Sequence, residues 1–356
     1  MNISLIGQSV NLLSTLDLTV LESSGLLFLE GRLITHNDSG NDPILYELDI
    51  FSGSVDREVV IENAVNVDWE DICYYADYIY VGDFGNNAGT RTDLKIYRVP
   101  ISDYLTTTND TVSADIIEFN YSDQSDFDPD LFNTNYDAEA LIAWNDSLYI
   151  FTKNWGNNRT NIYPLSMNPG NYEISKVDSL DSQGLVTGAT FNPYSNSIML
   201  SGYTFSEPFI IEISGLTTNQ FSAAEVIRST ISIPSGYSFQ VEAVSSINAD
   251  QYYISSEESI AGSAGLFRLE TDTTVSAIDI RSEDFSIFPN PCSGFFSIDS
   301  QETIQKVVIY DMKGGLVKSI EHKDGRFDCT TIPAGRYQFF IYSDGKTIIE
   351  DMIIEH

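Results

Sequence analysis

A repeated pattern of short strands in residues 1–282 is the feature that most restricts the fold of this chain. Five segments resemble one another and end in apolar residues: 22–28, 68–72, 137–142, 186–191 and 240–244. An alternating apolar stretch follows each of them, at residues 32–35, 78–82, 148–152, 197–201 and 251–255. Polar turn residues separate the two members of a pair, and this pattern is typical of a β-hairpin.

The repeat continues with a polar loop and a third strand, and several units add a fourth. The third strands are expected at residues 45–48, 94–99, 162–165, 209–213 and 266–269, and fourth strands at 58–61, 115–120 and 224–229. Recurring units of four antiparallel strands predict an all-β fold, the β-propeller. We count five blades, with strands in residues 3–13 completing the last one beside 266–269. A sixth blade that includes residues 276–280 and a stacked β-sandwich remain alternatives.

Composition agrees with a strand-rich fold and restricts the partners. The chain has 20 Tyr and 20 Phe, residues that favour strands. No apolar run is long enough for a transmembrane helix. Eighteen basic and 52 acidic residues give a net charge of −34, which repels phosphate backbones, so we expect no nucleic-acid partner. This charge suits Ca²⁺ or cationic ligands, although it could also serve only to keep the protein soluble.

Residues 283–356 read as a second, smaller domain. Phe288, Pro289, Asn290 and Pro291 open it, Val-Val-Ile-Tyr-Asp-Met-Lys-Gly follows at 307–314, and Pro-Ala-Gly335-Arg-Tyr337 comes later. Alternating apolar residues between Gly and Pro turns predict about seven short strands in a small immunoglobulin-like β-sandwich.

These motifs, in this order, resemble the type A C-terminal sorting domain of the type IX secretion system of Bacteroidetes. The resemblance implies recognition by the outer-membrane translocon, and therefore a secreted protein or one on the outer-membrane surface. The last strand departs from the family, because Glu350, Asp351 and Glu355 stand where members usually end with basic residues. Residues 1–20 lack the basic start of a signal peptide, so the sequence leaves open whether a leader precedes them.

Three cysteines are too few for a disulfide scaffold. Cys292 and Cys329 both adjoin predicted strands of the second domain. An oxidising compartment would allow them to form a disulfide, and the alternative is two small buried side chains. Cys73 falls on an inner strand of the propeller and is expected in its core.

Familiar catalytic signatures are absent, and carboxylates are the more informative group. Glu70, Glu139 and Glu242 occupy equivalent positions of three repeats, where the other two repeats have Gly25 and Gly188. Equivalent inner-strand residues converge on the axis of a propeller, so the three glutamates predict a metal site of the Ca²⁺ type or a carboxylate-lined pocket. Alternatively, each glutamate bonds backbone donors of the next blade and only locks the ring.

Polar residues of the loops after the second strands are expected around the same mouth. They are His36, Asp38, Asp83, Asn87, Lys153, Trp155 and Glu257, and they would suit a polar ligand or a sugar, or equally an ordinary turn. Of these, His36 is the one candidate base of its type in the propeller. A weaker second Ca²⁺ candidate is Asp126, Asp128, Asp130 and Asp137, whose spacing resembles a calcium loop although Leu131 stands where Gly is needed.

The segments of the Asp-Xaa-Glu-Ala-Leu type also loosely resemble propellers of the SdiA-regulated and phytase-esterase-like groups. Propellers host many functions, so activity does not follow from this likeness. The sequence favours an exported, monomeric propeller that binds a polar ligand or partner, with Ca²⁺ as the expected cofactor. The alternative is a Ca²⁺-dependent hydrolase of lactonase, esterase or phosphoesterase type that uses the channel carboxylates, so the sequence does not decide whether the protein is an enzyme.

Overall fold

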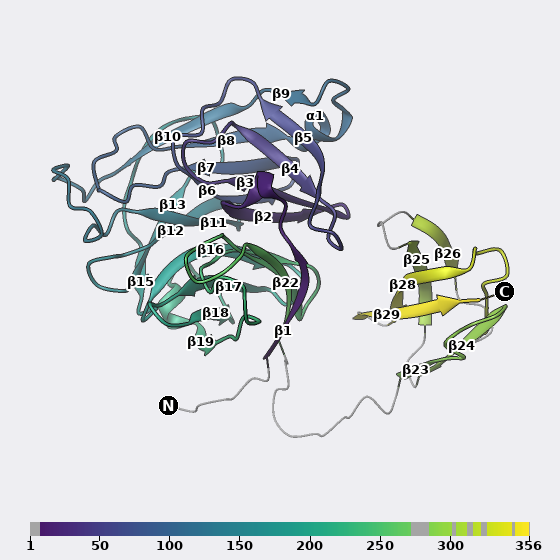
Figure 1. Cartoon of the computed structure of the whole chain (residues 1–356). Helices are drawn as coiled ribbons and strands as arrows, with labels where there is room; N and C mark the ends of the chain where they lie inside the picture. The colour runs from purple at the N-terminus through teal and green to yellow at the C-terminus, as the bar shows by residue number, and fades with distance from the viewer. Residues whose placement is uncertain are drawn as a thin grey trace. The chain divides into compact units, whose positions relative to one another are not determined.

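The computed structural model describes residues 8–271, 285–300, 304–311, 316–321, 326–343 and 346–355. It divides the chain into two compact units, Met1–Thr273 and Thr274–His356, each of which is described by itself (Figure 1). The predicted boundary at residues 282 and 283 lies outside the described residues. No helix in the described part has the length and apolar character that a membrane span requires.

Residues 8–271 form five β-sheets, which are the blades of a propeller. The first contains β2 (Ser23–Leu29), β3 (Arg32–Asn37), β4 (Ile44–Leu48), β5 (Val55–Ile61) and β9 (Thr111–Val112). The second contains β6 (Trp69–Tyr75), β7 (Tyr78–Asp83), β8 (Lys95–Pro100), β10 (Asp115–Tyr121) and β14 (Gly170–Ile174). The third contains β11 (Ala138–Trp144), β12 (Ser147–Thr152), β13 (Thr160–Leu165) and β15 (Asp178–Leu180). The fourth contains β16 (Leu185–Asn192), β17 (Ser197–Tyr203), β18 (Pro208–Ser214) and β19 (Glu225–Thr230).

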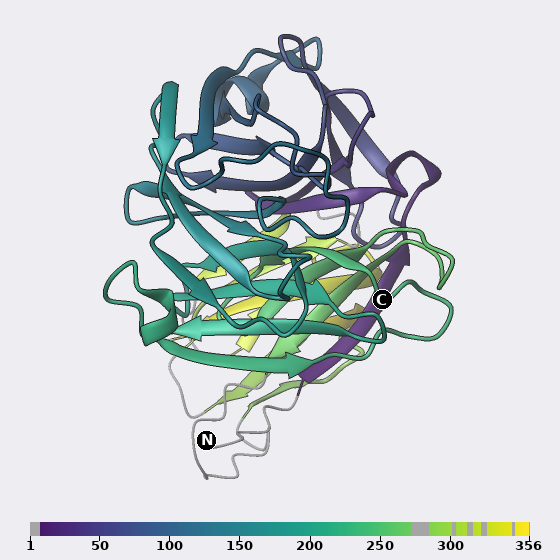
Figure 2. The same ribbon diagram turned by 90° about the vertical axis from the view of Figure 1, so that its left-hand side faces the viewer.

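The fifth blade closes the ring with a strand from the other end of the propeller. It contains β20 (Val241–Ser246), β21 (Gln251–Ser256), β22 (Gly265–Thr271) and the N-terminal β1 (Gln8–Thr15). β1 runs antiparallel to β22, with Gln8 opposite Thr271 and Thr15 opposite Gly265 (Figure 2). The innermost strands β2, β6, β11, β16 and β20 contact one another in cyclic order. The described residues therefore confirm the closed propeller and have five blades, while residues 276–280 lie outside them.

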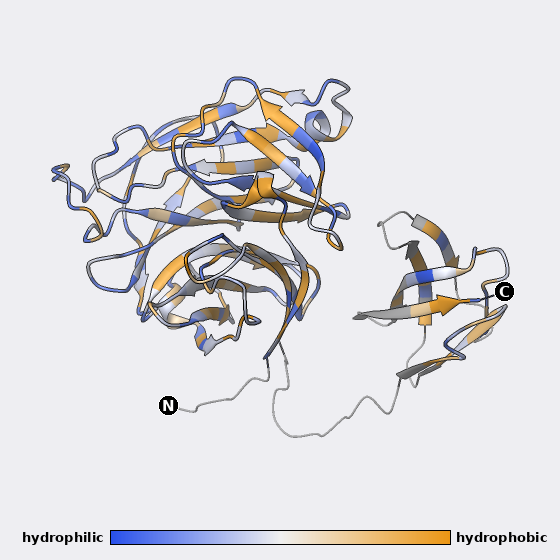
Figure 3. Ribbon diagram, in the orientation of Figure 1, coloured by the Kyte–Doolittle hydropathy of each residue, from blue (hydrophilic) through white to orange (hydrophobic). Residues whose placement is uncertain are grey.

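Apolar and polar residues are interspersed along the strands (Figure 3). Buried apolar side chains of neighbouring blades form common clusters. Leu27 and Ile34 of the first blade pack with Trp69 and Ile79 of the second, and similar clusters join the other blades. Helical structure among these residues is limited to η1 (Leu18–Val20), α1 (Ile101–Thr106) and η2 (Phe221–Ala223). Because each blade is covered on both faces, the side chains that remain available for chemistry lie at the two ends of the central channel.

The C-terminal unit has seven strands in its described residues, in two sheets. One sheet contains β23 (Phe285–Phe288), β24 (Phe295–Ser300) and β27 (Arg326–Asp328). The other contains β25 (Ile304–Asp311), β26 (Leu316–Glu321), β28 (Gly335–Ser343) and β29 (Lys346–Ile354). Phe296, Phe327 and Phe339 pack together in the core, as a small sandwich requires.

Two residues of the predicted sorting motifs tie this unit together. The Asn290 side chain accepts the Ile353 N–H at 3.0 Å, and so joins the segment after β23 to the last strand. The Tyr337 hydroxyl donates to the Pro333 carbonyl at 2.8 Å and anchors the start of β28. Phe288, Pro289 and Pro291 remain exposed, and Gly335 begins β28.

Cys292 and Cys329 are fully buried in this core and pair as a disulfide, while Cys73 is a buried free thiol. We expect an unreduced digest of denatured protein to yield one peptide pair that contains Cys292 and Cys329 and that separates on reduction. Alkylation in denaturant without reductant should label Cys73 alone. Labelling of all three cysteines under those conditions would contradict the pairing.

Candidate functional site

Each inner strand carries a β-bulge at the same place, and the bulge sets which side chains face the channel mouth. In each blade, the pairing register between the inner strand and the second strand shifts by one residue. The extra residues of the inner strands are Ser24, Glu70, Glu139, Thr187 and Glu242. A bulge re-aims the side chain of its extra residue. The counterparts of the three glutamates are therefore Ser24 and Thr187. The predicted equivalence with Gly25 and Gly188 is wrong by one position.

The next position along each strand is small in four blades and is an aspartate in the second. These residues are Gly25, Asp71, Ala140, Gly188 and Ala243. Asp71 is fully buried, and its Oδ2 accepts the N–H of Leu141 at 2.8 Å and of Ala189 at 3.1 Å. A Cβ at Gly188 would come within 2.6 Å of the Glu242 carbonyl oxygen, so the crowding there requires a small residue.

Asp71 thereby joins the second blade to the third and the fourth. Its Oδ1 accepts the N–H of Ile72 at 2.8 Å, so both carboxylate oxygens have partners. Burial raises the pKa of Asp71 well above its ordinary value, against the effect of these three N–H donors. The sequence left open that the glutamates bond backbone donors of other blades and hold the ring together. In the structure, Asp71 makes bonds of this kind.

A three-carboxylate cluster lies where the inner strands begin. Asp38 follows β3, Asp68 precedes β6, and Glu70 is the bulge residue of β6. One oxygen from each lies within 4.8 Å of the others, and no other such cluster occurs in the described part of the chain. A Cβ on Gly85 would meet the carboxylates of Glu70 and Asp68 and force them to shift, so glycine leaves the cluster room to assemble as it stands.

Electrostatics make this cluster costly when it is ionised. Burial, and then the neighbouring Asp38, raise the pKa of Asp68 to about 7. Burial and the charge of Glu139 raise the pKa of Glu70 well above its ordinary value. Burial also raises the pKa of Asp38. Carboxylates held together in this way favour either a proton or a cation between them.

A buried lysine lies among the other carboxylates of this mouth. Lys153 Nζ is 3.2 Å from Glu139 Oε2, and it lies over the rings of Trp155 and Tyr203 at 5.1 and 5.6 Å. Burial opposes the ammonium form, but Glu139, Tyr203 and Glu242 outweigh it and raise the pKa of Lys153. Glu139 therefore has a cation as its partner, unlike Glu70.

Two further glutamates complete the mouth. Burial raises the pKa of Glu242 to about 7, and burial with the nearby Glu242 raises that of Glu257 to about 8. Gln240 Nε2 donates to Glu257 Oε1 at 2.9 Å. We call the whole set the acidic mouth: Asp38, Asp68, Glu70, Asp137, Glu139, Lys153, Glu242 and Glu257. Seven carboxyl groups there share one lysine, since the nearby Arg91 is bound to Asp83 and Asp93.

The structure brings most of the predicted channel residues together, with three exceptions. Asp83 is fully buried and accepts from Arg91 Nη2 at 2.8 Å and from the Asp68 N–H at 3.1 Å. Asn87 lies in the loop between β7 and β8, where its carbonyl accepts the Phe132 N–H. Asp83 Oδ1 thus has its partners, whereas Asp83 Oδ2 is buried without a hydrogen-bond partner among the described residues.

His36 is the third exception, because it is not in a solvated loop. It belongs to β3, is fully buried, and packs edge-on against Trp69 with ring centroids 5.5 Å apart. Burial lowers the pKa of His36 to about 4, so the imidazole is neutral at physiological pH. The predicted position of His36 at the mouth is therefore wrong.

The second predicted calcium site does not assemble in the described residues. Asp126, Asp128 and Asp130 are exposed in the loop between β10 and β11. Asp137 is fully buried at the acidic mouth, where it accepts from the Asn86 N–H and from Trp155 Nε1 at 2.6 and 2.8 Å. The calcium-loop spacing is therefore coincidental, as the missing glycine at Leu131 suggested.

Sequence reasoning missed Asp68, Asp71 and Tyr203 as site residues. A signal for Asp68 exists in the repeat, because Asp68 stands two residues before Glu70, Asp137 before Glu139, and Gln240 before Glu242. All three stand immediately before the first residue of an inner strand, at equivalent places in their blades. Tyr203 lies opposite Leu185, two residues before the bulge, which is the place that Asp38, Lys153 and Glu257 take in their own blades, so the repeat held a signal for it as well.

The comparisons with known proteins bear on each unit separately. Residues 286–355 match the model of the secretion system C-terminal sorting domain. No curated protein matches the chain by sequence. Among solved structures, an aldose sugar dehydrogenase from Streptomyces coelicolor is 12% identical with a TM-score of 0.44, over 74% of this chain and 98% of that one. An exo-β-1,3-galactanase from Phanerochaete chrysosporium is 10% identical with a TM-score of 0.44, over 98% of this chain and 90% of that one.

The match to the sorting domain agrees with the motifs at Phe288–Pro291 and Gly335–Tyr337 and with the seven-stranded sandwich that contains them. Such domains direct export to the cell surface or the medium. The chain is thus a secreted or cell-surface protein, in which a β-propeller with five blades in its described residues is followed by a C-terminal sorting domain of the type IX secretion system.

Proposed function

We propose that this exported propeller binds a polar ligand at its acidic mouth with the help of a Ca²⁺ ion held by Asp38, Asp68 and Glu70. The observation that carries the proposal is the approach of three carboxylate oxygens to within 4.8 Å of one another. Lys153 is paired with Glu139 and Arg91 with Asp83, so neither neutralises this cluster directly. Hard carboxylate oxygens are the ligands that Ca²⁺ prefers.

The rest of the mouth supplies what a polar ligand would need beside the ion. Lys153 with its two aromatic neighbours, Gln240 and Glu257 offer donors, acceptors and ring faces in one place. Exposed apolar side chains also occur on the loops at this end of the propeller: Leu18, Val65, Val67, Phe127, Leu131, Phe132, Phe205 and Ile260. An acidic centre with apolar tips around it suits a cationic or metal-bridged ligand that is part of a larger partner.

Calorimetric titration with CaCl₂ tests the ion. We expect one site in the wild-type protein and at least a roughly hundredfold loss of affinity in the Asp68→Asn/Glu70→Gln double variant, since two of its three carboxylates are removed. The Asp126→Asn/Asp128→Asn variant is the matched control, because it removes the same charge from an exposed loop. Absence of calcium-linked heat in the wild type, or equal affinity in the site and control variants, would contradict the proposal.

A hydrolase remains a second candidate on one observation. Glu242 and Glu257 have pKa values of about 7 and about 8, so both hold protons in the range where general acids operate. A Ca²⁺ ion at the neighbouring cluster would polarise the substrate, and a carboxylate would act as base in place of the buried His36. Turnover in a screen of esters, lactones and phosphoesters that is lost in both Glu242→Gln and Glu257→Gln would establish this activity. Its absence, or turnover that neither variant changes, would exclude it.

A further inference from the structure

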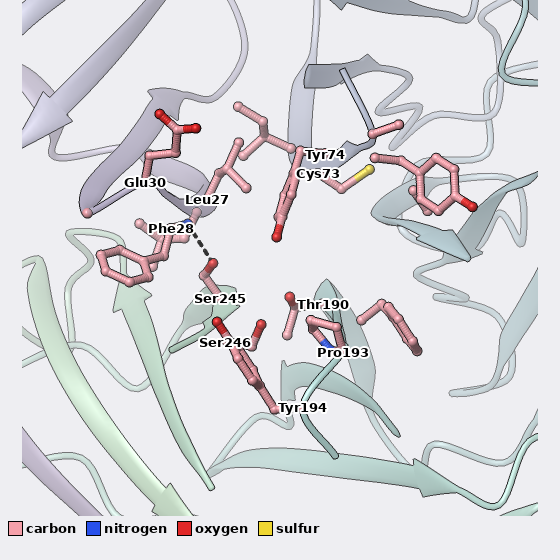
Figure 4. A pocket seen from close by; sticks show the side chains of 17 residues that line it. Leu27, Phe28, Glu30, Cys73, Tyr74, Thr190, Pro193, Tyr194, Ser245 and Ser246 are labelled. Atoms are coloured by element: carbon pink, nitrogen blue, oxygen red, sulfur yellow. Dashed lines mark hydrogen bonds between the residues drawn. The ribbon is translucent and has the colours of Figure 1, made fainter. Parts of the chain in front are cut away.

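The other end of the central channel contains a separate concavity, where the inner strands end (Figure 4). Its volume is about 360 Å³, within the range of small-molecule sites. All five blades contribute to it, with Phe28 of β2, Tyr74 of β6, Ala143 of β11, Thr190 of β16 and Ser246 of β20 among the lining residues. We call it the aromatic pocket.

The aromatic pocket is distinct from the acidic mouth. Strand β6 presents Glu70 to the mouth, buries Asp71 completely, and then presents Ile72, Cys73 and Tyr74 to the pocket. Because Asp71 is bound to the backbone of two other blades at this level, protein fills the axis between the two ends. A ligand in the pocket would therefore be independent of any ion at the mouth.

The pocket combines a buried apolar floor with exposed aromatic walls. Leu26, Ile72 and Ala143 form the floor and are almost inaccessible. Tyr74 and Tyr194 face the cavity and remain 42% and 67% exposed, so their rings are accessible to a ligand (Figure 4). Tyr74 and Tyr194 come from the second and fourth blades and line the same cavity.

Part of this wall is fixed before any ligand arrives. The Phe28 ring meets Tyr253 edge-on with centroids 5.3 Å apart, and the Phe28 N–H donates to Ser245 Oγ at 2.8 Å. That bond leaves the Ser245 hydroxyl hydrogen available as a donor. A ring held in place in this way costs little conformational entropy on binding, so it suits stacking of a ligand.

The charges of the lining restrict the class of ligand. Glu30 is the only charged residue that lines the pocket, and no Lys or Arg is among the described lining residues. Phosphates and carboxylates are therefore disfavoured, and the net charge of −34 adds to their repulsion. A purely apolar ligand would form no hydrogen bonds with the hydroxyls of Tyr74, Thr190 and Ser246, so a ligand with polar groups is favoured.

We propose that the aromatic pocket binds the ring of a neutral sugar. A pyranose has an apolar face that can stack on Tyr194 or Phe28 and a rim of hydroxyls that can bond the phenols, Thr190 and Glu30. The ring could belong to a free monosaccharide or to the end of a glycan chain, since the same face and hydroxyls are offered in both cases.

Ligand-observed NMR and calorimetry on the full-length protein test this binding. The probes are the methyl β-glycosides of glucose, galactose and N-acetylglucosamine, methyl α-mannoside, and the oligosaccharides cellotetraose and laminaritetraose. We expect millimolar binding of at least one glycoside and at least a roughly tenfold loss in Tyr194→Ala and in Tyr74→Ala. Tyr194→Phe keeps the ring and should lose less than Tyr194→Ala. Phe205→Ala is the matched control, because it removes an exposed aromatic ring from the opposite end of the propeller.

The outcomes distinguish a free monosaccharide from the end of a glycan chain, and binding at the aromatic pocket from binding at the acidic mouth. Equal affinity for a monosaccharide and the matching oligosaccharide indicates recognition of one ring, and tighter oligosaccharide binding indicates a chain end. Unchanged melting temperatures of the variants would exclude unfolding as the cause of a loss. No binding of any probe up to about 20 mM, or binding that the Phe205→Ala control weakens as much as Tyr194→Ala, would overturn the proposal.

Discussion

Replacing Asp71 by alanine is expected to lower the free energy of unfolding of the propeller by about 4 kcal/mol. The substitution removes the acceptor of the Leu141 and Ala189 N–H groups, which belong to two different blades and lie in the buried centre of the ring. Each buried donor that is left without a partner costs about 1–3 kcal/mol. Alanine also leaves room that no neighbouring side chain fills, which adds to the loss.

Asp71→Asn separates the hydrogen bonds from the charge. Its amide oxygen can take the place of Oδ2 and accept from Leu141 and Ala189, but its NH₂ group would then face the Ile72 N–H, which also donates. We expect a loss roughly half that of alanine. Denaturant unfolding followed by circular dichroism measures both, with Asp77→Ala in an exposed turn as the control. An Asp71→Ala protein as stable as Asp77→Ala would show that Asp71 does not hold the blades together.

The hairpins were predictable because their signals are local. Alternation and turn residues define each inner pair, and β2 with β3 or β16 with β17 lie within a few residues of the expected ranges. Closure by β1 was also predictable, because the fifth unit lacked a fourth strand and the N-terminus offered one. Strands and turns are encoded in short stretches of sequence, and the repeat presents the same pattern in several blades.

The arrangement of the mouth was less predictable because it depends on contacts between blades. The bulge at Glu70 moves the equivalence from Gly25 to Ser24, and no sequence pattern marks where a bulge falls. β3 extends through Asn37, so His36 turns into the space between two blades instead of toward solvent. Asp71 reads as an ordinary strand residue until three blades are brought around it. The carboxylates Glu139, Glu242 and Glu257, by contrast, were found because the repeat or its loops placed them.

Without divalent cations, the propeller is expected to lose stability as the pH rises from about 5 to about 8. Asp68, Glu242 and Glu257 have pKa values of about 7, about 7 and about 8 in the folded protein. In the unfolded chain such groups ionise near pH 4. Between these values the folded state binds more protons than the unfolded state, so the free energy of unfolding falls with pH. This is the opposite of the usual behaviour of salt-bridged carboxylates, whose pKa is lowered by folding.

The size of this fall in the free energy of unfolding, and its response to Ca²⁺, distinguish a mouth that binds a cation from one that is only acidic. Each group that keeps its proton contributes at most about 1.4 kcal/mol per pH unit, so the buried Glu242 alone accounts for a fall of about 2–3 kcal/mol between pH 5 and its pKa. Asp68 and Glu257 add smaller amounts, because solvent screens them. Glu242→Gln and Glu257→Gln should each flatten the slope, because the amide does not ionise. Ca²⁺ at millimolar concentration should raise stability at pH 8 and have little effect at pH 5, since it competes with protons for the oxygens of Asp38, Asp68 and Glu70. Denaturant unfolding across this range, with and without Ca²⁺, measures both. A flat profile without Ca²⁺, or a Ca²⁺ effect that is as large at pH 5 as at pH 8, would show that the mouth carboxylates are not the groups that bind the ion.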